Sequence, residues 1–200
     1  MRVIMLNKGR ESVYTSNVYL VLGTWSALED INTLVDTGTD DSLLAEIEKI
    51  YTGVGKKHIE RVILTHGHFD HAGGLSAIVQ WYKPEVYAFS DINMRDKPLR
   101  DGQMIRMGDR DFEVIHAPVH SNDSICLYSS IECVLFSGDT PLNIRTPGGS
   151  YNKVFVNLLE RLSCLEIAVL YSGHDLPMTG NVNGMIIDTL SNVKKSRIVV

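Results

Sequence analysis

Four residues that commonly bind metal ions fall within one six-residue window of this 200-residue chain: His66, His68, Asp70 and His71. The apolar run before the window predicts a buried strand, and the apolar stretch from Leu75 to Tyr82 predicts a helix. Side chains two residues apart in an extended segment point the same way. We therefore expect His66 and His68 to converge on one cation. Asp70 and His71 can then face a neighbouring site, where the chain turns into the helix.

Imidazole suits zinc, copper, iron and nickel, and a carboxylate brings in manganese or magnesium and can neutralise a dication. A chance cluster of surface histidines is the alternative explanation of the window. It is disfavoured because other predicted strand ends carry residues of the same kind, namely Asp36, His120, Asp139 and His174. Before Asp139 and His174, as in the window, an apolar strand is followed by a small residue and then by the polar one. This recurrence predicts that the strand ends meet at one edge of the fold.

Composition and charge narrow the class of protein. Apolar residues make up 44% of the chain and charged residues 22%, which is typical of a globular protein. We expect residues 1–200 to form a single domain. The formal net charge is -5 and no Lys/Arg block stands out, so a nucleic-acid partner is disfavoured. The expected partner is a small-molecule substrate, for the reasons given with the expected reaction below. The sequence does not specify the oligomeric state.

The three cysteines have no close pairing pattern, which argues against a disulfide framework and fits a reducing compartment. The N-terminal apolar run is too short for a signal peptide, and no run approaches membrane-spanning length. A cytoplasmic location without a membrane partner is therefore expected.

Hydrophobic periodicity predicts strands and helices in both halves of the chain. Strands are expected at residues 2–6, 17–22, 32–35, 59–65, 85–89, 104–107, 112–116, 124–128, 133–136 and 167–171. Helices are expected from Asp40, as N-cap, to about residue 51, and at 75–83, 151–162 and 182–195, with a connecting loop at 90–102. This order favours an α/β fold, a four-layer αββα sandwich. A doubly wound nucleotide-binding fold is the weaker alternative, because no Gly-x-Gly-x-x-Gly follows an early strand.

The His-x-His-x-Asp-His window, the later His120, the Gly-Asp pair at Asp139 and the Gly-His pair at His174 resemble the metallo-β-lactamase superfamily. Within it, the set is similar to that of glyoxalase II-like metal-dependent hydrolases. The resemblance covers nearly the whole chain. It implies the metallo-β-lactamase fold, with a binuclear metal site between the sheets. The implied cofactor is two divalent ions, zinc in the first instance, with iron or manganese as alternatives.

The resemblance also implies a role for each residue. His66, His68 and His120 would hold the first metal, and Asp70, His71 and His174 the second. Asp139 would bridge the two ions, which in two-metal hydrolases lie about 3.5–4 Å apart. Asp36 would orient the ligand loop by hydrogen bonds, although an aspartate that stabilises the turn before Gly38 explains the sequence equally well. Taken singly, His120, Asp139 and His174 could likewise be turn or strand-end residues.

The expected reaction is hydrolysis of a small thioester, ester or lactone by a hydroxide bridged by the two metals. Asp70 is the expected catalytic residue, which would orient the hydroxide and collect its proton. Arg145 could bind an anionic substrate group and Tyr151 could hydrogen-bond a substrate, the alternative being a surface arginine and a tyrosine at a helix start. Glutathione thioesters are disfavoured, because the chain lacks the Cys-Gly-Lys/Arg-Phe-type pattern of glyoxalase II and room for its added C-terminal helical domain.

Three alternative functions stay open at this point. A phosphodiesterase or nuclease is disfavoured by the acidic net charge and by the lack of a basic docking arm. A mononuclear iron enzyme that resembles persulfide dioxygenases would need only one metal site. The last alternative is a metal-binding protein without catalytic activity. Metal content would separate these alternatives first.

Overall fold

A computed structural model describes residues 1–8, 13–89 and 97–199 of the chain. The first sheet has the strand order β1-β2-β3-β4-β5-β6. Its strands are β1 (Arg2–Leu6), β2 (Val18–Leu22), β3 (Thr33–Val35), β4 (Arg61–Ile63), β5 (Glu85–Ala88) and β6 (Lys97–Pro98). The first three strands are antiparallel to one another, and β3 to β6 run parallel.

The second sheet has the order β13-β12-β10-β9-β8-β7. Its strands are β7 (Met104–Met107), β8 (Arg110–His116), β9 (Ile125–Ser129), β10 (Val134–Gly138), β12 (Val169–Ser172) and β13 (Met178–Thr179). Within it only β10 and β12 pair in parallel. A separate pair of short strands, β11 (Ser150–Asn152) and β14 (Arg197–Val199), lies beyond the helices of this half.

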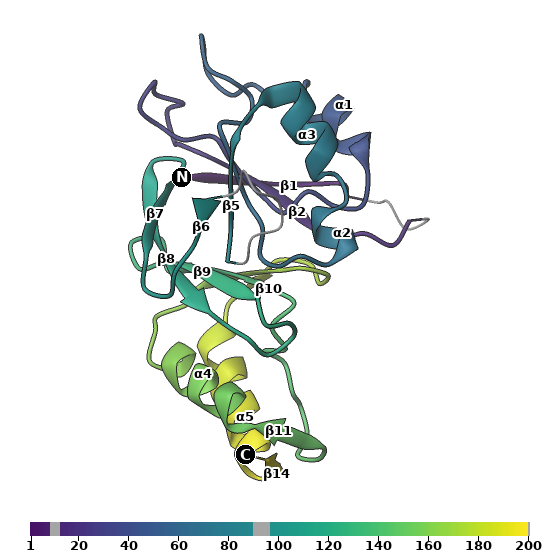
Figure 1. The fold of residues 1–200 in the computed structure, drawn as a ribbon. Coiled ribbons are helices and arrows are strands. Elements are labelled where there is room, and N and C mark those ends of the chain that lie inside the picture. Colours follow the sequence, from purple (N-terminus) through teal and green to yellow (C-terminus); the bar gives the residue numbers. More distant parts are fainter. Residues whose placement is uncertain (9–12, 90–96, 200) are drawn as a thin grey trace.

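Helices cover the outer face of each sheet, so the molecule has four layers (Figure 1). On the first sheet they are the 3-10 turn η1 (Asp41–Leu43) and the helices α1 (Leu44–Ile47), α2 (Phe69–Ala72) and α3 (Leu75–Tyr82). On the second sheet they are α4 (Lys153–Ser163) and α5 (Val182–Lys194). The αββα sandwich expected from the sequence is confirmed.

Three apolar clusters hold the layers together. One joins the first sheet to its helices, and includes the fully buried Leu34 and Ile47. A second joins the other sheet to α4 and α5 and includes Leu159. The third lies between the two sheets, where Phe112 and Phe136 are among the largest buried side chains. Burying one such side chain contributes roughly 1.5–3 kcal/mol, so the inter-sheet cluster provides a rigid base for the loops at the strand ends.

The structure differs from the sequence expectations in several short elements. The helix after Asp40 ends at Ile47, because beyond its C-cap, Glu48, the amides of Lys49 and Ile50 bond to carbonyls only three residues back and tighten the turn. Residues 97–98 of the expected loop form β6, and residues 90–96 of that loop lie outside the described residues. Strand β13 and the strand pair β11–β14 were not expected. Strands of two or three residues depend on pairing with distant segments, and leave little periodicity to detect.

The expected helix at 151–162 begins two residues later than predicted. Tyr151 belongs to β11 and pairs with Ile198, and Asn152 is the N-cap of α4. The Asn152 side chain accepts a hydrogen bond from the amide of Phe155 at 2.8 Å, which is the usual way to start a helix. Among the residues that the structure describes, no helix has both the length and the apolar character needed to cross a bilayer.

Candidate metal centre

The polar strand ends meet at one edge of the sandwich. Asp36 follows β3, His66 follows β4, Asp139 follows β10 and His174 follows β12, so each lies just beyond the carboxyl end of its strand. The loop after β8 supplies His120. Since β3, β4, β10 and β12 are all interior strands of the two sheets, the fold gathers these side chains where the sheets face each other.

Two groups of donor atoms result, each with all its atoms within 4.8 Å of one another. The first group is His66, His68 and His120. The Nε2 atom of His120 lies 2.9 Å from Nδ1 of His68. The rings of His66 and His120 meet edge to face, with centroids 4.8 Å apart. Three imidazoles that converge in this way can provide three ligands to one cation.

The second group is Asp70, His71, Asp139 and His174. Nε2 of His174 lies 3.2 Å from Oδ2 of Asp70 and 3.3 Å from Oδ2 of Asp139. The same Asp139 oxygen lies 3.4 Å from Nε2 of His120 in the first group. Asp139 therefore stands between the two groups and can serve both.

Unpartnered buried atoms test whether a cation fits here. Nε2 of His66, Nε2 of His71 and Oδ1 of Asp139 are buried and make no hydrogen bond within the described part of the chain. Nε2 of His71 and Oδ1 of Asp139 lie 3.2 Å apart. Leaving such atoms without a partner costs roughly 1–3 kcal/mol each. A donor set of imidazoles and carboxylates, with unpartnered buried atoms in both groups, fits divalent transition metals.

Asp36 orients one of the donors from behind. Its Oδ2 accepts the Nδ1–H of His71 at 2.8 Å and the hydroxyl of Thr65 at 2.8 Å, and its Oδ1 accepts the amide of Thr65 at 2.7 Å. Because a carboxylate offers only acceptors, the neutral His71 ring carries its proton on Nδ1 and leaves the Nε2 lone pair free. Carboxylates behind ligating histidines commonly act in this way.

The electrostatics of the cation-free site depend on these carboxylates. Burial lowers the pKa of the His71 imidazole, but Asp36 and Asp139 outweigh burial and raise the pKa to about 10. Burial, together with the neighbouring His71, lowers the pKa of His66 to about 4. Burial acts to raise the pKa of Asp139, but the surrounding imidazoles lower it to about 2. In the cation-free site, a proton on His71 thus provides the positive charge that a bound cation would otherwise provide.

Several residues that hold the donor loops in place were missed by sequence reasoning. Asn17 donates its amide to the carbonyl of Gly173 at 2.6 Å, and its side chain donates to the carbonyls on either side of the Gly173–His174 pair. Asp123 accepts the amide of Gly67 at 2.8 Å, which ties the histidine window to the His120 loop. These contacts join segments far apart in sequence, so no local pattern announces them.

Gly173 is required by the close packing of the donors. A Cβ atom on it would come within 2.0 Å of Oδ1 of Asp139 and 2.8 Å of Cε1 of His71. Tyr14 stacks on the ring of His174, with centroids 5.4 Å apart and an interplanar angle of 23°. Both contacts fix where the second group of donors can stand.

A pocket of about 570 Å³ opens beside the two groups. His120, Asp139 and His174 line it, and so does Arg145, on the segment after β10. Tyr151 does not line this pocket, because β11 holds it against Phe155 with ring centroids 5.7 Å apart. Of the two expected substrate contacts, the structure therefore brings only Arg145 to the site.

Residues 12–174 match the sequence pattern of the metallo-beta-lactamase superfamily. The chain belongs to this superfamily. The family resemblance inferred from the histidine window is thereby confirmed.

Similarity to individual members of the superfamily is modest. The chain is 28% identical over 194 residues to an atrochrysone carboxyl ACP thioesterase from Paecilomyces divaricatus, covering 96% of this chain and 60% of that protein. It is 35% identical over 124 residues to a probable hydroxyacylglutathione hydrolase from Schizosaccharomyces pombe, covering 58% of this chain and 48% of that protein. The chain thus spans about half the length of the curated relatives it matches.

Solved structures share the same fold. One of them, described as the peroxy diiron species of the chemotaxis sensor ODP, matches with a TM-score of 0.73 at 18% identity, over 94% of this chain and 90% of that one. At this level of identity the match supports the architecture alone.

Proposed function

We propose that this protein is a metal-dependent hydrolase of small thioesters, esters or lactones, with two divalent cations as its cofactor. The observation that carries the proposal is the position of Asp139, whose Oδ2 lies 3.4 Å from a donor of the first group and 3.3 Å from a donor of the second. A carboxylate shared between two sets of donors is what a pair of neighbouring cations requires, since their mutual repulsion needs an anion between them.

Each donor has a place in this assignment. His66, His68 and His120 would hold one cation, Asp70, His71 and His174 the other, and Asp139 both. Cations bound there would supply an activated water with a pKa of about 7 and would polarise the substrate carbonyl. Zinc fits the donor set, and so do iron and manganese.

The chain's own residues provide positioning and proton transfer. Asp36 holds the His71 ring in the tautomer that leaves Nε2 free. Asp70, whose Oδ2 is 3.2 Å from Nε2 of His174, would orient the attacking water and accept its proton. Arg145, which lines the same pocket as the donors, would bind an anionic part of the substrate.

The relatives support hydrolysis of thioesters in particular. The names of the two curated relatives described above are those of a thioesterase and of a hydroxyacylglutathione hydrolase, and the bond cleaved in both cases is a thioester. The pocket beside the donors has the size of an ordinary small-molecule site.

The test is metal analysis followed by hydrolysis assays on the metal-loaded protein. We expect two ions per chain, and turnover of S-acetyl-N-acetylcysteamine above that of a lactone and of bis-p-nitrophenyl phosphate. His68→Ala should lose bound metal and reduce kcat/KM by at least about a thousandfold, because a ligand is removed outright. Arg145→Ala should raise KM for an anionic substrate, and an unchanged KM would return Arg145 to a surface role.

His58→Ala is the matched control, since His58 lies outside both donor groups and contacts Thr52 and Glu48. It should keep the wild-type metal content and activity. Full activity in His68→Ala would show that the donor groups are not the catalytic centre.

A further inference from the structure

A second hollow continues the pocket away from the donor groups. It measures about 500 Å³, and it shares Asn143, Arg145, Met178 and Met185 with the pocket beside the donors. The two hollows therefore form one groove, which leads from Asp139 and His174 towards the C-terminal end of α5.

One face of α5 forms the length of this groove. Asn181, Met185, Asp188, Asn192 and Lys195 line it, and their spacing of four, three, four and three residues places them on a single helical stripe. From Asn181 to Lys195 there are fourteen steps of 1.5 Å, so the stripe extends about 21 Å. The groove is therefore long enough for an extended chain and much longer than a small acyl group needs.

The segment after β10 also lines the groove, and α5 holds this segment in place by hydrogen bonds. Thr189 is 1% exposed, donates its hydroxyl to the carbonyl of Leu142 at 2.7 Å and accepts the amide of Ile144 at 3.0 Å. Asn192 donates its side-chain amide to the carbonyl of Ile144 at 2.9 Å. The backbone that carries Arg145 is thus fixed against the helix, which lowers the entropic cost of using its side chain for binding.

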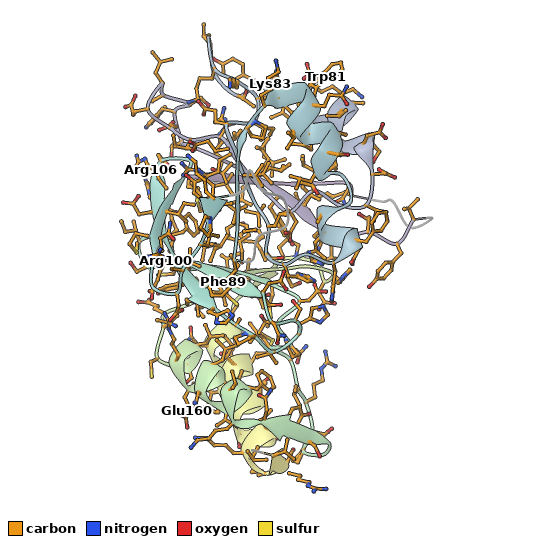
Figure 2. All side chains as sticks on the ribbon, in the orientation of Figure 1. Trp81, Lys83, Phe89, Arg100, Arg106 and Glu160 are labelled. Atoms are coloured by element: carbon orange, nitrogen blue, oxygen red, sulfur yellow. The ribbon has the colours of Figure 1, made fainter. Side chains whose placement is uncertain are left out.

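The charges in the groove indicate what its far end would bind. Arg145 stands where the two hollows join, and Lys195 stands at the end of α5. Neither cation forms an ion pair with another described residue, whereas the adjacent Lys194 pairs with Glu160 of α4, labelled in Figure 2, at 2.6 Å. Asp188 is the one carboxylate in the lining of the second hollow, so the two cations outnumber it. Met178 and Met185, which line both hollows as Arg145 does, add soft, apolar side chains to the lining.

We propose that the substrate is an elongated thioester whose arm runs along α5 past Arg145 and ends in an anionic group, phosphate or carboxylate, bound by Lys195. The inference rests on the proposed hydrolysis for the position of the thioester at the donor groups. The length of the arm is inferred from the length of the groove, and the charge at its end from the cations that line the groove.

Binding of non-hydrolysable thioethers tests the arm without any turnover. We would measure Kd by calorimetry for S-methyl-4′-phosphopantetheine, for S-methylpantetheine, which lacks the phosphate, and for S-methylglutathione, which carries carboxylates. At least one anionic arm should bind about tenfold or more tightly than S-methylpantetheine, because hydrogen bonds to charged groups are stronger than those between neutral groups. The two anionic arms distinguish phosphate from carboxylate as the recognised group.

Lys195→Gln should abolish this preference, and Lys194→Gln, on the same helix turn but paired with Glu160, should retain it. Equal Kd values for all three arms, or equal losses in the two lysine variants, would overturn the inference. Hydrolysis of S-acetyl-N-acetylcysteamine, which has almost no arm, separates the two ideas. Turnover of this short thioester without any arm preference would support the proposed hydrolysis and contradict the proposed role of the groove. An arm preference that depends on Lys195, without turnover of any thioester, would support the role of the groove and contradict the proposed hydrolysis.

Discussion

Asp36 and His71 form a buried pair in which the imidazole Nδ1–H donates to the carboxylate at 2.8 Å, although Asp36 has a backbone φ of 60°. Non-glycine residues seldom adopt this left-handed conformation, which aspartate and asparagine tolerate best. The conformation turns the side chain under the histidine window, where it also binds Thr65 twice. The unusual backbone thus serves the orientation of a donor.

Asp36→Asn should weaken metal binding about 10- to 100-fold, as is usual when a group behind a ligating histidine is changed. Asparagine keeps the size and tolerates the φ of this position, so the fold should survive. Isothermal titration with zinc measures the effect. Asp41→Asn, an exposed aspartate in η1, is the control and should bind zinc like the wild type. Unchanged affinity in Asp36→Asn would mean that the pair does not position His71.

Gly173→Ala should displace Asp139, because the new Cβ would come within 2.0 Å of its Oδ1. Since Asp139 stands between both donor groups, we expect loss of both cations rather than one. Metal content by elemental analysis should fall from two ions per chain to less than one, with an unchanged far-UV circular dichroism spectrum. Retention of two ions would show that Asp139 can move aside and still bridge.

Metal affinity should fall as the pH falls. In the cation-free protein Asp36 and Asp139 outweigh burial and raise the pKa of His71 to about 10, so its ring is protonated at neutral pH and a cation must displace that proton. If the cation in the second donor group displaces one proton, its affinity should change about tenfold per pH unit below the raised pKa of His71. Proton release on adding zinc in weakly buffered solution at pH 7 measures it. Zinc binding without release, and with a pH-independent Kd, would contradict the prediction.

Removing the cations should lower the melting temperature. Each donor group draws residues from both halves of the sandwich, so bound metal links the two sheets. At a free metal concentration about 100 times Kd, the stabilisation is about 2.7 kcal/mol, or roughly 5–10 °C for a chain of this size. Differential scanning fluorimetry with zinc and with EDTA measures the shift. His58→Ala should show the full shift and His68→Ala a much smaller one.

Much of the architecture and the set of converging side chains could be predicted from the sequence. The strands at Arg2–Leu6 and Val18–Leu22 and the helix at Leu75–Tyr82 carry strong periodic patterns, and each lies within one residue of its predicted bounds. The histidine window was recognisable because donor types at short spacing are rare by chance. The structure also brings Asp139 and His174 beside it, as expected from their positions after apolar strands.

The residues that support the donors could not be predicted, for a physical reason. Asn17 and Asp123 act through hydrogen bonds to segments more than 50 residues away, and nothing in their own neighbourhood differs from an ordinary turn. Tyr151 was misplaced for a similar reason, since its pairing with Ile198 depends on a strand at the other end of the chain. A local sequence pattern reveals the donors, whereas the hydrogen bonds that hold them in place can be seen only in the folded molecule.

The groove along α5 is built from a different layer than the donors. The donors stand on strand ends fixed by the core between the sheets, while the groove depends on the surface of one outer helix and on the segment that Thr189 holds against it. Substitutions on that helix face can therefore retune which compounds are accepted while the reaction chemistry is inherited intact. Evolution or protein engineering could therefore change substrate selectivity through this helix face with little effect on catalysis.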